Sequence, residues 1–384
     1  MAKAFVIGYT VGYMIPDVIK LTQDLVAIPS VSIDSNVAVS DYLQRLLLAL
    51  DFEVERLSYD DNGQEKVSLV ARKGSGSGGL GFFSHSDTVP GDQGWNPYDP
   101  VIANGKLYGR GSCDMKGPLA ATIVAAAKTD VKSLKRPIYI GVASDEENGY
   151  HGAMQICRES KLLAQNWPTH GVIAEPTEMR PVYSHKGGTS ITVTAIGFAA
   201  HTSTEKGTSA NFLIAPFLAE MAELVPYFKT EARFLNHEFN PPSFGFNMTL
   251  NDFGTRGNVS AGKTVCGLSI RNMPKVDNEG AIALISEKAQ KYGLKVDVHM
   301  SDYFYVSPQN SMVQAACRAT GLAQPETVAY GTEAVIYQKY IANQVVLGPG
   351  NIAQAHTVGE WITLDQLTGS VGTYERLIAE LCGA

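Results

Sequence analysis

Histidine and acidic side chains stand where they could bind a metal ion. His85 and Asp87 directly follow Leu80–Ser84, an apolar segment with the character of a buried strand. Asp114 lies in a glycine-rich turn just before 119–127, an Ala-rich segment that is typical of a helix. Imidazole and carboxylate are the usual zinc ligands of hydrolases, so these residues could form half of a metal site. Each motif also has a structural explanation. A lone His-x-Asp is common in proteins, and an aspartate before a helix is commonly an N-cap.

Further acidic and histidine side chains follow other predicted strands. They are Glu146 and Glu147 after Ile138–Ala143, Glu175 after 171–174, and His356 downstream of 345–347. Asp114 follows a further short segment, 106–108, so five predicted strand ends offer His, Asp, Glu, Glu and His in that order. Charged loops are usually only solvated, but binding sites of α/β sheets form at the carboxyl ends of strands. The repetition therefore favours a metal centre over five unrelated loops.

Six segments together carry a resemblance to a known family. They read SHSDTVPG, YGRGSCDMKGP, ASDEENG, AEPTE, GFAAHTS and GPGNIAQAH. In this order and approximate spacing they resemble the co-catalytic zinc amidohydrolases and peptidases, which include acetylornithine deacetylase, succinyl-diaminopimelate desuccinylase, the aminoacylases and glutamate carboxypeptidase. The resemblance covers nearly the whole chain, from about Pro16 onward. Within the family, YGRGSCDMKG, YGTEA and VLGPG look most like the acetylornithine deacetylases.

The resemblance implies two zinc ions per chain, with Co²⁺ or Mn²⁺ as alternatives. The motif match makes Asp114 the bridging ligand. It assigns His85 and Glu175 to one ion, and Glu147 and His356 to the other. Co-catalytic ions of this kind lie about 3.5 to 4 Å apart, which is why they share a carboxylate.

Three neighbouring acidic residues receive different roles. Asp87 is expected to accept the far imidazole N–H of His85. Glu146 is expected to be the general acid/base. We expect Glu146 and Glu147 in an extended segment, where successive side chains alternate and so separate a base from a ligand. A one-residue change of register would exchange these two roles, and Asp145 is expected to cap the turn.

The resemblance also assigns roles to residues in the middle of the chain. His201 would cross the interface of a homodimer and stabilise the tetrahedral oxyanion in the partner's site, although a half-buried strand-end histidine is the structural alternative. Asn258 and Arg271 would bind the substrate carboxylate, a bidentate task for which arginine is suited. Lys186 is expected to be a solvated hinge residue.

The activity that the resemblance implies is metal-dependent hydrolysis of a linear amide in an N-acyl amino acid. The substrate expected first is N-acetyl-ornithine, in arginine biosynthesis. Succinyl-diaminopimelate, another N-acyl amino acid and a dipeptide with a free carboxylate are alternatives with the same chemistry. A catalytically silent binding module is an alternative of another class, and the complete ligand set argues against it.

The predicted fold is α/β, with a mixed-sheet catalytic domain and an inserted α+β, ferredoxin-like lid or dimerisation domain. We expect residues 1–186 and 303–384 to form the catalytic domain and residues 187–302 the insertion. Two turns are expected along the chain: 74–79, a hairpin-like turn between two strands of the catalytic domain, and 183–188, a glycine-rich crossing into the insertion. A chain of 384 residues is long enough for two cores.

Composition excludes several other classes. The net charge is −7 without a basic block, which disfavours nucleic acid as a partner, and no apolar run is long enough to cross a membrane. Residues 1–14 make a poor signal peptide, and five scattered cysteines are typical of a reducing cytoplasm. The G-x-G-x-x-A match at 348–353 is a weak dinucleotide signal, because no acidic partner follows on another strand.

Overall fold

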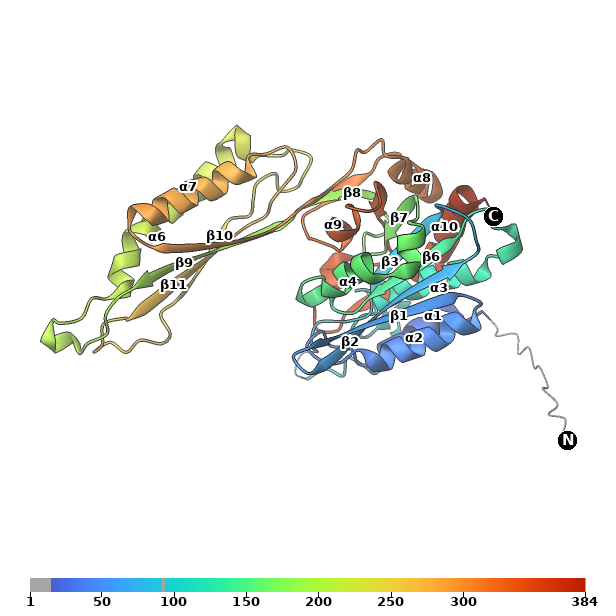
Figure 1. The fold of residues 1–384 in the computed structure, drawn as a ribbon, viewed down its shortest axis with the longest axis horizontal. Helices are drawn as coiled ribbons and strands as arrows, with labels where there is room; N and C mark the ends of the chain where they lie inside the picture. Colours follow the sequence, from blue (N-terminus) through green and yellow to red (C-terminus); the bar gives the residue numbers. More distant parts are fainter. Residues whose placement is uncertain (1–14, 92–93, 384) are drawn as a thin grey trace. The chain divides into compact units, whose positions relative to one another are not determined.

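The computed structural model describes residues 15–91 and 94–383, so the segment 1–14 considered above lies outside the described residues (Figure 1). By their internal contacts these residues divide into two compact units. The first contains the described residues up to Pro181, with Pro308–Pro325 and the residues from Ile336 onward. The second contains Val182–Ser307 and Glu326–Val335.

The first unit is built on a mixed sheet with the strand order β1-β2-β6-β3-β7-β15. The strands are β1 (Glu53–Asp61), β2 (Gln64–Lys73), β6 (Ile138–Ala143), β3 (Leu80–His85), β7 (His170–Ile173) and β15 (Asn343–Val346). Pairing is antiparallel from β1 to β6 and parallel from β6 to β15. Every residue of β3 and β6 is buried, as expected for central parallel strands.

The strand order corrects one expectation. β6 lies between β2 and β3, so residues 74–79 connect two strands that are not neighbours and do not form a hairpin turn. The parallel order also places the carboxyl ends of β3, β6, β7 and β15 at one edge of the sheet. The polar segments that follow these strands therefore meet there, which is the arrangement that a site needs.

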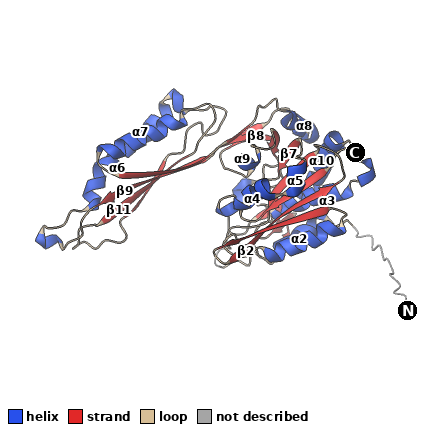
Figure 2. Ribbon diagram, viewed as in Figure 1, coloured by secondary structure: helices blue, strands red, loops and turns tan. Residues whose placement is uncertain are grey.

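Helices cover this sheet (Figure 2). They are α1 (Val18–Val26), α2 (Val37–Ala49), α3 (Lys116–Lys128), α4 (His151–Glu159), α5 (Lys161–Gln165), α8 (Ser311–Thr320) and α10 (Leu364–Cys382). α3 contacts α1, α10 and β3, and its residues from Lys116 to Ala127 are all buried. Its alanines and glycine leave room for these close neighbours. A three-stranded antiparallel sheet, β4 (Val101–Ala103), β5 (Lys106–Tyr108) and β16 (Trp361–Thr363), lies in the same unit.

The second unit contains a four-stranded antiparallel sheet with the order β10-β11-β9-β12. Its elements follow the chain as β9 (Gly188–Ile196), α6 (Ala210–Thr230), β10 (Asn247–Asn251), β11 (Lys263–Ile270), α7 (Asn278–Lys291) and β12 (Lys295–Ser301). This βαββαβ sequence with that strand order is ferredoxin-like. Burial alternates along β9, and the buried side chains join a core that includes Phe217, Phe228 and Phe234. The predicted mixed α/β fold with an added α+β unit is confirmed.

One short strand of the second unit was not expected. Residues 182–185 form β8 (Val182–His185) at the start of the predicted glycine-rich crossing. β8 pairs with β13 (Phe304–Tyr305) and β14 (Glu326–Val328), and its four residues are buried. The glycines after it masked the strand, because only the four residues before them are extended.

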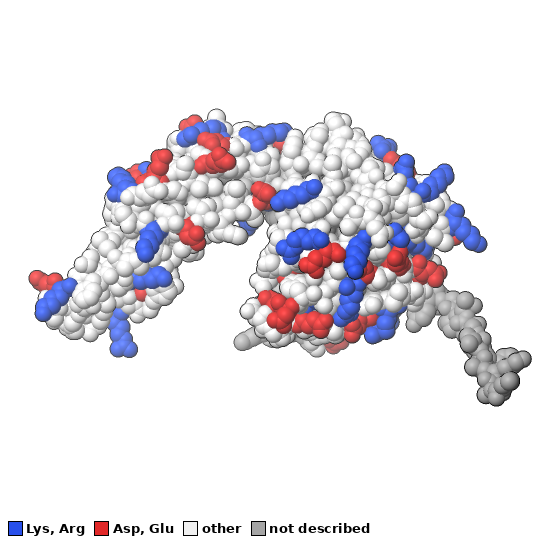
Figure 3. Space-filling model, viewed as in Figure 1, with Lys and Arg blue, Asp and Glu red and all other residues white. Residues whose placement is uncertain are grey.

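Two further expectations concern a basic patch on the surface and a helix that could cross a membrane. On the face drawn in Figure 3, Lys and Arg are scattered among Asp and Glu and do not gather into a single basic patch. Within residues 15–91 and 94–383, no helix is both long and apolar enough to cross a membrane.

Candidate metal centre

His85 stands at the end of β3 with its ring held from one side. Its Nδ1 lies 3.0 Å from the backbone carbonyl oxygen of Asp87 and 3.3 Å from a carboxylate oxygen of the same residue. Nε2 therefore points the other way, 3.2 Å from Asp114 Oδ1 and 3.6 Å from Glu175 Oε1. The ring is fully buried. An imidazole fixed by Nδ1 with Nε2 among carboxylates has the geometry of a metal ligand.

Asp114 lies between two imidazoles. Its Oδ1 faces His85, while its Oδ2 lies 3.3 Å from Nε2 of His356. Nε2 of His356 is also 2.9 Å from Glu147 Oε1. Two histidines that are 271 positions apart in the chain thus address opposite oxygens of one carboxylate. This is the disposition that a bridging ligand requires.

The donor atoms form two overlapping groups. His85, Asp114 and Glu147 make one, and His85, Glu146 and Glu175 make the other; within each, the donor atoms lie within 4.8 Å of one another. Nitrogen and carboxylate oxygen donors of this kind suit zinc, cobalt or manganese. The predicted ligands His85, Asp114, Glu147, Glu175 and His356 are therefore brought together, and their chemistry fits a metal centre.

The electrostatics of the centre favour cations. Hydrogen bonds with Asp114 and Glu147 raise the pKa of His356 to about 10. Burial lowers the pKa of His85, but hydrogen bonds to Asp114 and Asp87 outweigh it and leave that pKa well above its usual value. Burial alone would raise the pKa of Asp114, yet its bonds to the two histidines bring that pKa below its usual range. Positive charge is stabilised here, as a divalent ion would also be.

The turn that carries Glu146 and Glu147 differs from our expectation. These residues begin a 3-10 turn, η2 (Glu146–Asn148), so the predicted extended segment is wrong. In a 3-10 turn, successive side chains are about 120° apart and still diverge. Glu146 Oε2 lies 4.0 Å from His85 Nε2, whereas Glu147 Oε1 is against His356.

The carboxylate of Asp87 holds this turn. Oδ1 accepts the backbone N–H of Glu146 at 3.0 Å, and Oδ2 accepts that of Glu147 at 3.2 Å. Oδ2 also accepts the hydroxyl of Ser32 at 2.6 Å. The predicted contact with His85 is therefore one of several, and Asp87 orients the histidine and the glutamate turn together.

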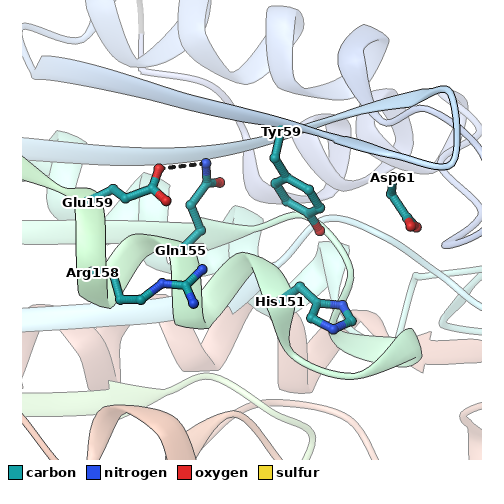
Figure 4. Close-up of a pocket in the computed structure, with 6 residues that line it drawn as sticks. All are labelled: Tyr59, Asp61, His151, Gln155, Arg158 and Glu159. Atoms are coloured by element: carbon teal, nitrogen blue, oxygen red, sulfur yellow. Dashed lines mark hydrogen bonds between the residues drawn. The ribbon is translucent and has the colours of Figure 1, made fainter.

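Asp145 does not cap η2 as expected, because its side chain makes no capping bond there. Its Oδ1 instead accepts the N–H of Gly152 in α4 at 2.6 Å. Its Oδ2 accepts the hydroxyl of Tyr59 at 2.5 Å and lies 3.2 Å from Nδ1 of His151. Tyr59 and His151 line one pocket of ≈ 250 Å³ (Figure 4). Asp145 thus ties η2 to β1 and α4.

Cys113, next to Asp114, is buried, and its Sγ lies 3.3 Å from the carbonyl oxygen of Asn351. Burial raises its pKa well above the usual value. The thiol is therefore held protonated, which opposes a role as nucleophile.

The predicted residues of the second unit lie at two ends of its sheet. His201 and Asn258 are exposed on adjacent segments, since His201 bridges to Val259 and Thr202 N–H donates to the Asn258 carbonyl. Both lie beyond the Ile196 end of β9, where Lys263 pairs with Ile196. Arg271 follows Ile270, which pairs with Thr189 at the other end. A nine-residue strand separates the ends by roughly 26 Å at about 3.3 Å per residue.

Lys186 is not the solvated residue that we expected. It is 2% exposed, and its Nζ donates to the carbonyls of Pro241 and Ser243 at 2.7 Å each. Burial lowers its pKa to about 8. The two glycines that follow Lys186 suggested a hinge, whereas its ammonium group is a buried anchor for residues 241–243.

Two charged residues behind the centre escaped sequence reasoning. Arg110 and Glu360 form a buried ion pair at 2.8 Å, and Glu360 contacts the loop of Asp114. No spacing rule joins residues 250 positions apart. The available signal was that each lies close to a predicted ligand, Arg110 before Asp114 and Glu360 after His356.

The model of the peptidase family M20/M25/M40 matches residues 81–380. The acetylornithine deacetylase of Myxococcus xanthus is 33% identical over 374 residues, which cover 94% of this chain and 96% of that protein. The acetylornithine deacetylase of Proteus mirabilis (strain HI4320) is 31% identical over 390 residues, covering 96% and 97%.

Solved structures agree on the fold. An M20 family metallo-carboxypeptidase from Sulfolobus solfataricus has a TM-score of 0.74 and 16% identity, over 94% of this chain and 98% of that one. A dinuclear metal binding peptidase of the M20 family from Bacillus subtilis has a TM-score of 0.64 and 16% identity, over 95% and 98%. The family match covers most of the chain, and the relatives match nearly its whole length. The chain therefore belongs to the peptidase family M20/M25/M40 and is a metal-dependent amidohydrolase.

Proposed function

We propose that the protein is an acetylornithine deacetylase that hydrolyses N-acetyl-ornithine to ornithine and acetate. The observation that carries this proposal is the carboxylate of Asp114 between the imidazoles of His85 and His356. The named relatives, which match along nearly their whole length, support the substrate. They also support a role in arginine biosynthesis.

We further propose two zinc ions per chain as the cofactors. Asp114 would bridge them, His85 and Glu175 would hold one, and Glu147 and His356 the other. Bound there, the ions would polarise the amide carbonyl and lower the pKa of water towards about 7. The two imidazoles on opposite oxygens of the Asp114 carboxylate support a dinuclear site.

Glu146 is the proposed general acid/base. Its carboxylate lies at the edge of the ligand cluster, 4.0 Å from the imidazole of His85, and its side chain is 10% exposed. There it can accept a proton from the attacking water and return it to the departing amine. Asp87 fixes the backbone of this residue, so the base is held in position before substrate arrives.

The protein is proposed to act as a homodimer through the inserted domain, residues 187–302. His201 and Asn258 lie at one end of β9 and Arg271 at the other, so one chain cannot direct all three at a single substrate. Two chains related by a twofold axis could supply the two ends to each other's sites. In this dimer, Arg271 and Asn258 bind the substrate carboxylate and His201 stabilises the oxyanion.

Exposed apolar side chains in the second unit support such an interface. They are Ile196, Phe198, Phe212, Leu250 and Phe253, with exposed fractions of 53%, 63%, 84%, 55% and 60%. A cytoplasmic location, inferred from the scattered cysteines, completes the proposal; all five thiols are free within the described residues.

The test compares Glu146→Gln with the wild type on N-acetyl-ornithine and N-succinyl-diaminopimelate. We expect a strong preference for the acetyl substrate, and a loss of kcat of at least about 100-fold in Glu146→Gln with zinc still bound. Glu159→Gln, which changes an exposed glutamate of α4, is the matched control and should keep full activity.

The other outcomes point to definite alternatives. Preference for the succinyl substrate would make the protein a desuccinylase. Release of an amine from another N-acyl amino acid, and not from N-acetyl-ornithine, would reject the proposed role in arginine biosynthesis. Full activity in Glu146→Gln would mean that Glu147 is the base. Bound zinc without turnover of any N-acyl amino acid or dipeptide would identify a silent binding module.

A further inference from the structure

Glu360 and Arg110 are two charged residues buried directly behind the loop of Asp114. Their exposed fractions are 0% and 1%. Strand pairing brings Glu360 there, because β16 begins with the next residue and pairs antiparallel with β5. The N–H of Gly109, which follows β5, donates to the carbonyl of Glu360 at 2.9 Å. Glu360, the residue just before β16, thus lies against the segment that leads from β5 to Asp114.

One carboxylate oxygen of Glu360 organises this loop. Oε1 accepts the backbone N–H groups of Gly111 at 3.1 Å, Cys113 at 2.9 Å and Asp114 at 3.0 Å. Three N–H groups that converge on one anionic oxygen fix the loop backbone more firmly than neutral bonds would. The side chain of Asp114 projects from this backbone, so Glu360 determines where its carboxylate lies.

Arg110 compensates the negative charge of the buried Glu360 carboxylate. Its Nη1 donates to Glu360 Oε2 at 2.8 Å, and its Nη2 donates to the carbonyl of Pro90 at 3.1 Å. The guanidinium also lies 5.2 Å from the ring centroid of Trp95. A buried carboxylate so close to Asp114 would otherwise be strongly unfavourable.

The loop has little room to adjust. Gly111 has φ +85°, which a side chain rarely permits, and a Cβ there would lie 3.0 Å from atoms of Lys116 and Thr88. Glu360 also stands four residues after His356. The short segment 356–360 therefore begins with His356, a proposed metal ligand, and ends with Glu360, which binds the backbone of the loop that carries the bridging ligand.

We propose that Glu360 is a positioning residue of the metal centre: it fixes the bridging carboxylate of Asp114 through three backbone N–H groups, with Arg110 as its counter-ion. This inference rests on the proposed dinuclear centre but not on the identity of the substrate. The carboxylate of Glu360 contacts the backbone N–H groups of the Asp114 loop and the guanidinium of Arg110. It acts only through the backbone of the Asp114 loop.

The test is a graded pair of substitutions with metal binding as the principal measurement. Glu360→Gln keeps an acceptor oxygen, so we expect metal affinity, measured by competition with a chelator, to fall about 10-fold. Glu360→Ala removes the acceptor and should lower it about 100-fold or more. The visible absorption spectrum of the cobalt-loaded protein should change in the same order, since it reports ligand geometry. Where turnover can be measured, kcat should fall with little change in KM.

Control variants separate positioning from general stability. Glu380→Gln disrupts an exposed ion pair with Arg318 and should leave metal affinity and spectrum unchanged. The double variant Glu360→Gln, Arg110→Met removes both buried charges. If it recovers the thermal unfolding temperature but keeps the weakened metal affinity, the positioning role stands even where Glu360→Ala fails to fold.

Two results would overturn the inference. One is a folded Glu360→Gln and a folded Glu360→Ala with wild-type metal affinity and cobalt spectrum. The other is a double variant in which metal affinity returns together with stability. Loss of metal affinity in the variants of a protein that does not hydrolyse N-acetyl-ornithine would support the positioning role and reject the proposed substrate.

Discussion

Asp87 shows how much of this site depends on a residue that need not touch a metal ion. Its buried carboxylate accepts two backbone N–H groups of the glutamate turn and the hydroxyl of Ser32, and it faces Nδ1 of His85. Burial raises the pKa of Asp87, but the bonds from His85 and Ser32 outweigh it and keep that pKa below its usual value. The carboxylate is therefore ionised, as its donors require.

We expect Asp87→Asn to lower kcat by about 10- to 100-fold, because an amide cannot accept all of these donors. It should also cost about 1 to 3 kcal/mol of the free energy of unfolding, since buried donors lose their acceptor. Ser32→Ala removes one donor only and should have a smaller effect. Steady-state kinetics and denaturant unfolding provide the measurements.

Asp297→Asn, on the exposed surface of β12, is the control and should match the wild type. If Asp87→Asn had the kcat of this control, Asp87 would not be the organiser of the glutamate turn.

At the scale of single elements, β8 holds a histidine that is buried without charge. His185 is 1% exposed; its Nδ1 lies 2.9 Å from the carbonyl of Lys186, and its Nε2 accepts the N–H of Thr332 at 3.2 Å. A protonated ring could not accept that bond. Burial accordingly lowers the pKa of His185 from 6.5 to about 4. The hydrogen bond between β8 and Thr332, in the segment after β14, therefore forms only while the ring is neutral.

This lowered pKa predicts a pH dependence of stability. Between pH 6.5 and 4 the unfolded chain binds a proton at this histidine and the folded chain does not, so the contribution is complete above pH 6.5 and is lost as the pH falls. From pH 7.5 to 5 the stability of the wild type relative to His185→Asn should decrease by about 2 kcal/mol. Denaturant unfolding of both proteins across this range measures the difference.

His299→Asn changes an exposed histidine of β12 and is the control for this experiment. Its stability should follow that of the wild type at every pH. A constant difference between wild type and His185→Asn from pH 7.5 to 5 would contradict the neutral, buried ring.

At the scale of the whole molecule, the proposed dimer makes activity depend on a surface far along the chain from the metal ligands. Phe212 in α6 is 84% exposed. We expect the wild type to have twice the chain mass of 41.3 kDa in light scattering, and Phe212→Glu to shift it towards the monomer. Because His201 and Asn258 would then be missing from each site, kcat should fall at least about 10-fold while zinc stays bound.

Leu48→Glu is the control, because Leu48 is an exposed apolar residue of the first unit, at 52%. It should remain dimeric and active. A wild-type protein that is monomeric and fully active at assay concentrations would refute both the dimer and the role of His201.

The secondary structure that sequence patterns predicted well is the part with strong local signals. β6 occupies the predicted residues 138–143, and β5 the predicted residues 106–108. In both cases, residues that favour turns mark the ends of the segment. β8 and the 3-10 turn η2 were missed, because glycines in one case and a run of three acids in the other resemble a loop. Only the pairing of β8 with β13 and β14, and the hydrogen bonds that the η2 backbone donates to Asp87, make these segments regular.

The sequence by itself determined the family, the type of fold and the identity of the candidate ligands, because ligand chemistry and strand ends leave local marks in the chain. The tertiary structure decided which residues hold the ligands in place: Asp87 binds the glutamate turn, and Glu360, paired with Arg110, binds the Asp114 loop. It also decided that His185 and Lys186 are buried. These contacts join residues that are far apart in the chain and share no motif. Their strength comes from burial and from converging hydrogen bonds, which exist only after the chain has folded.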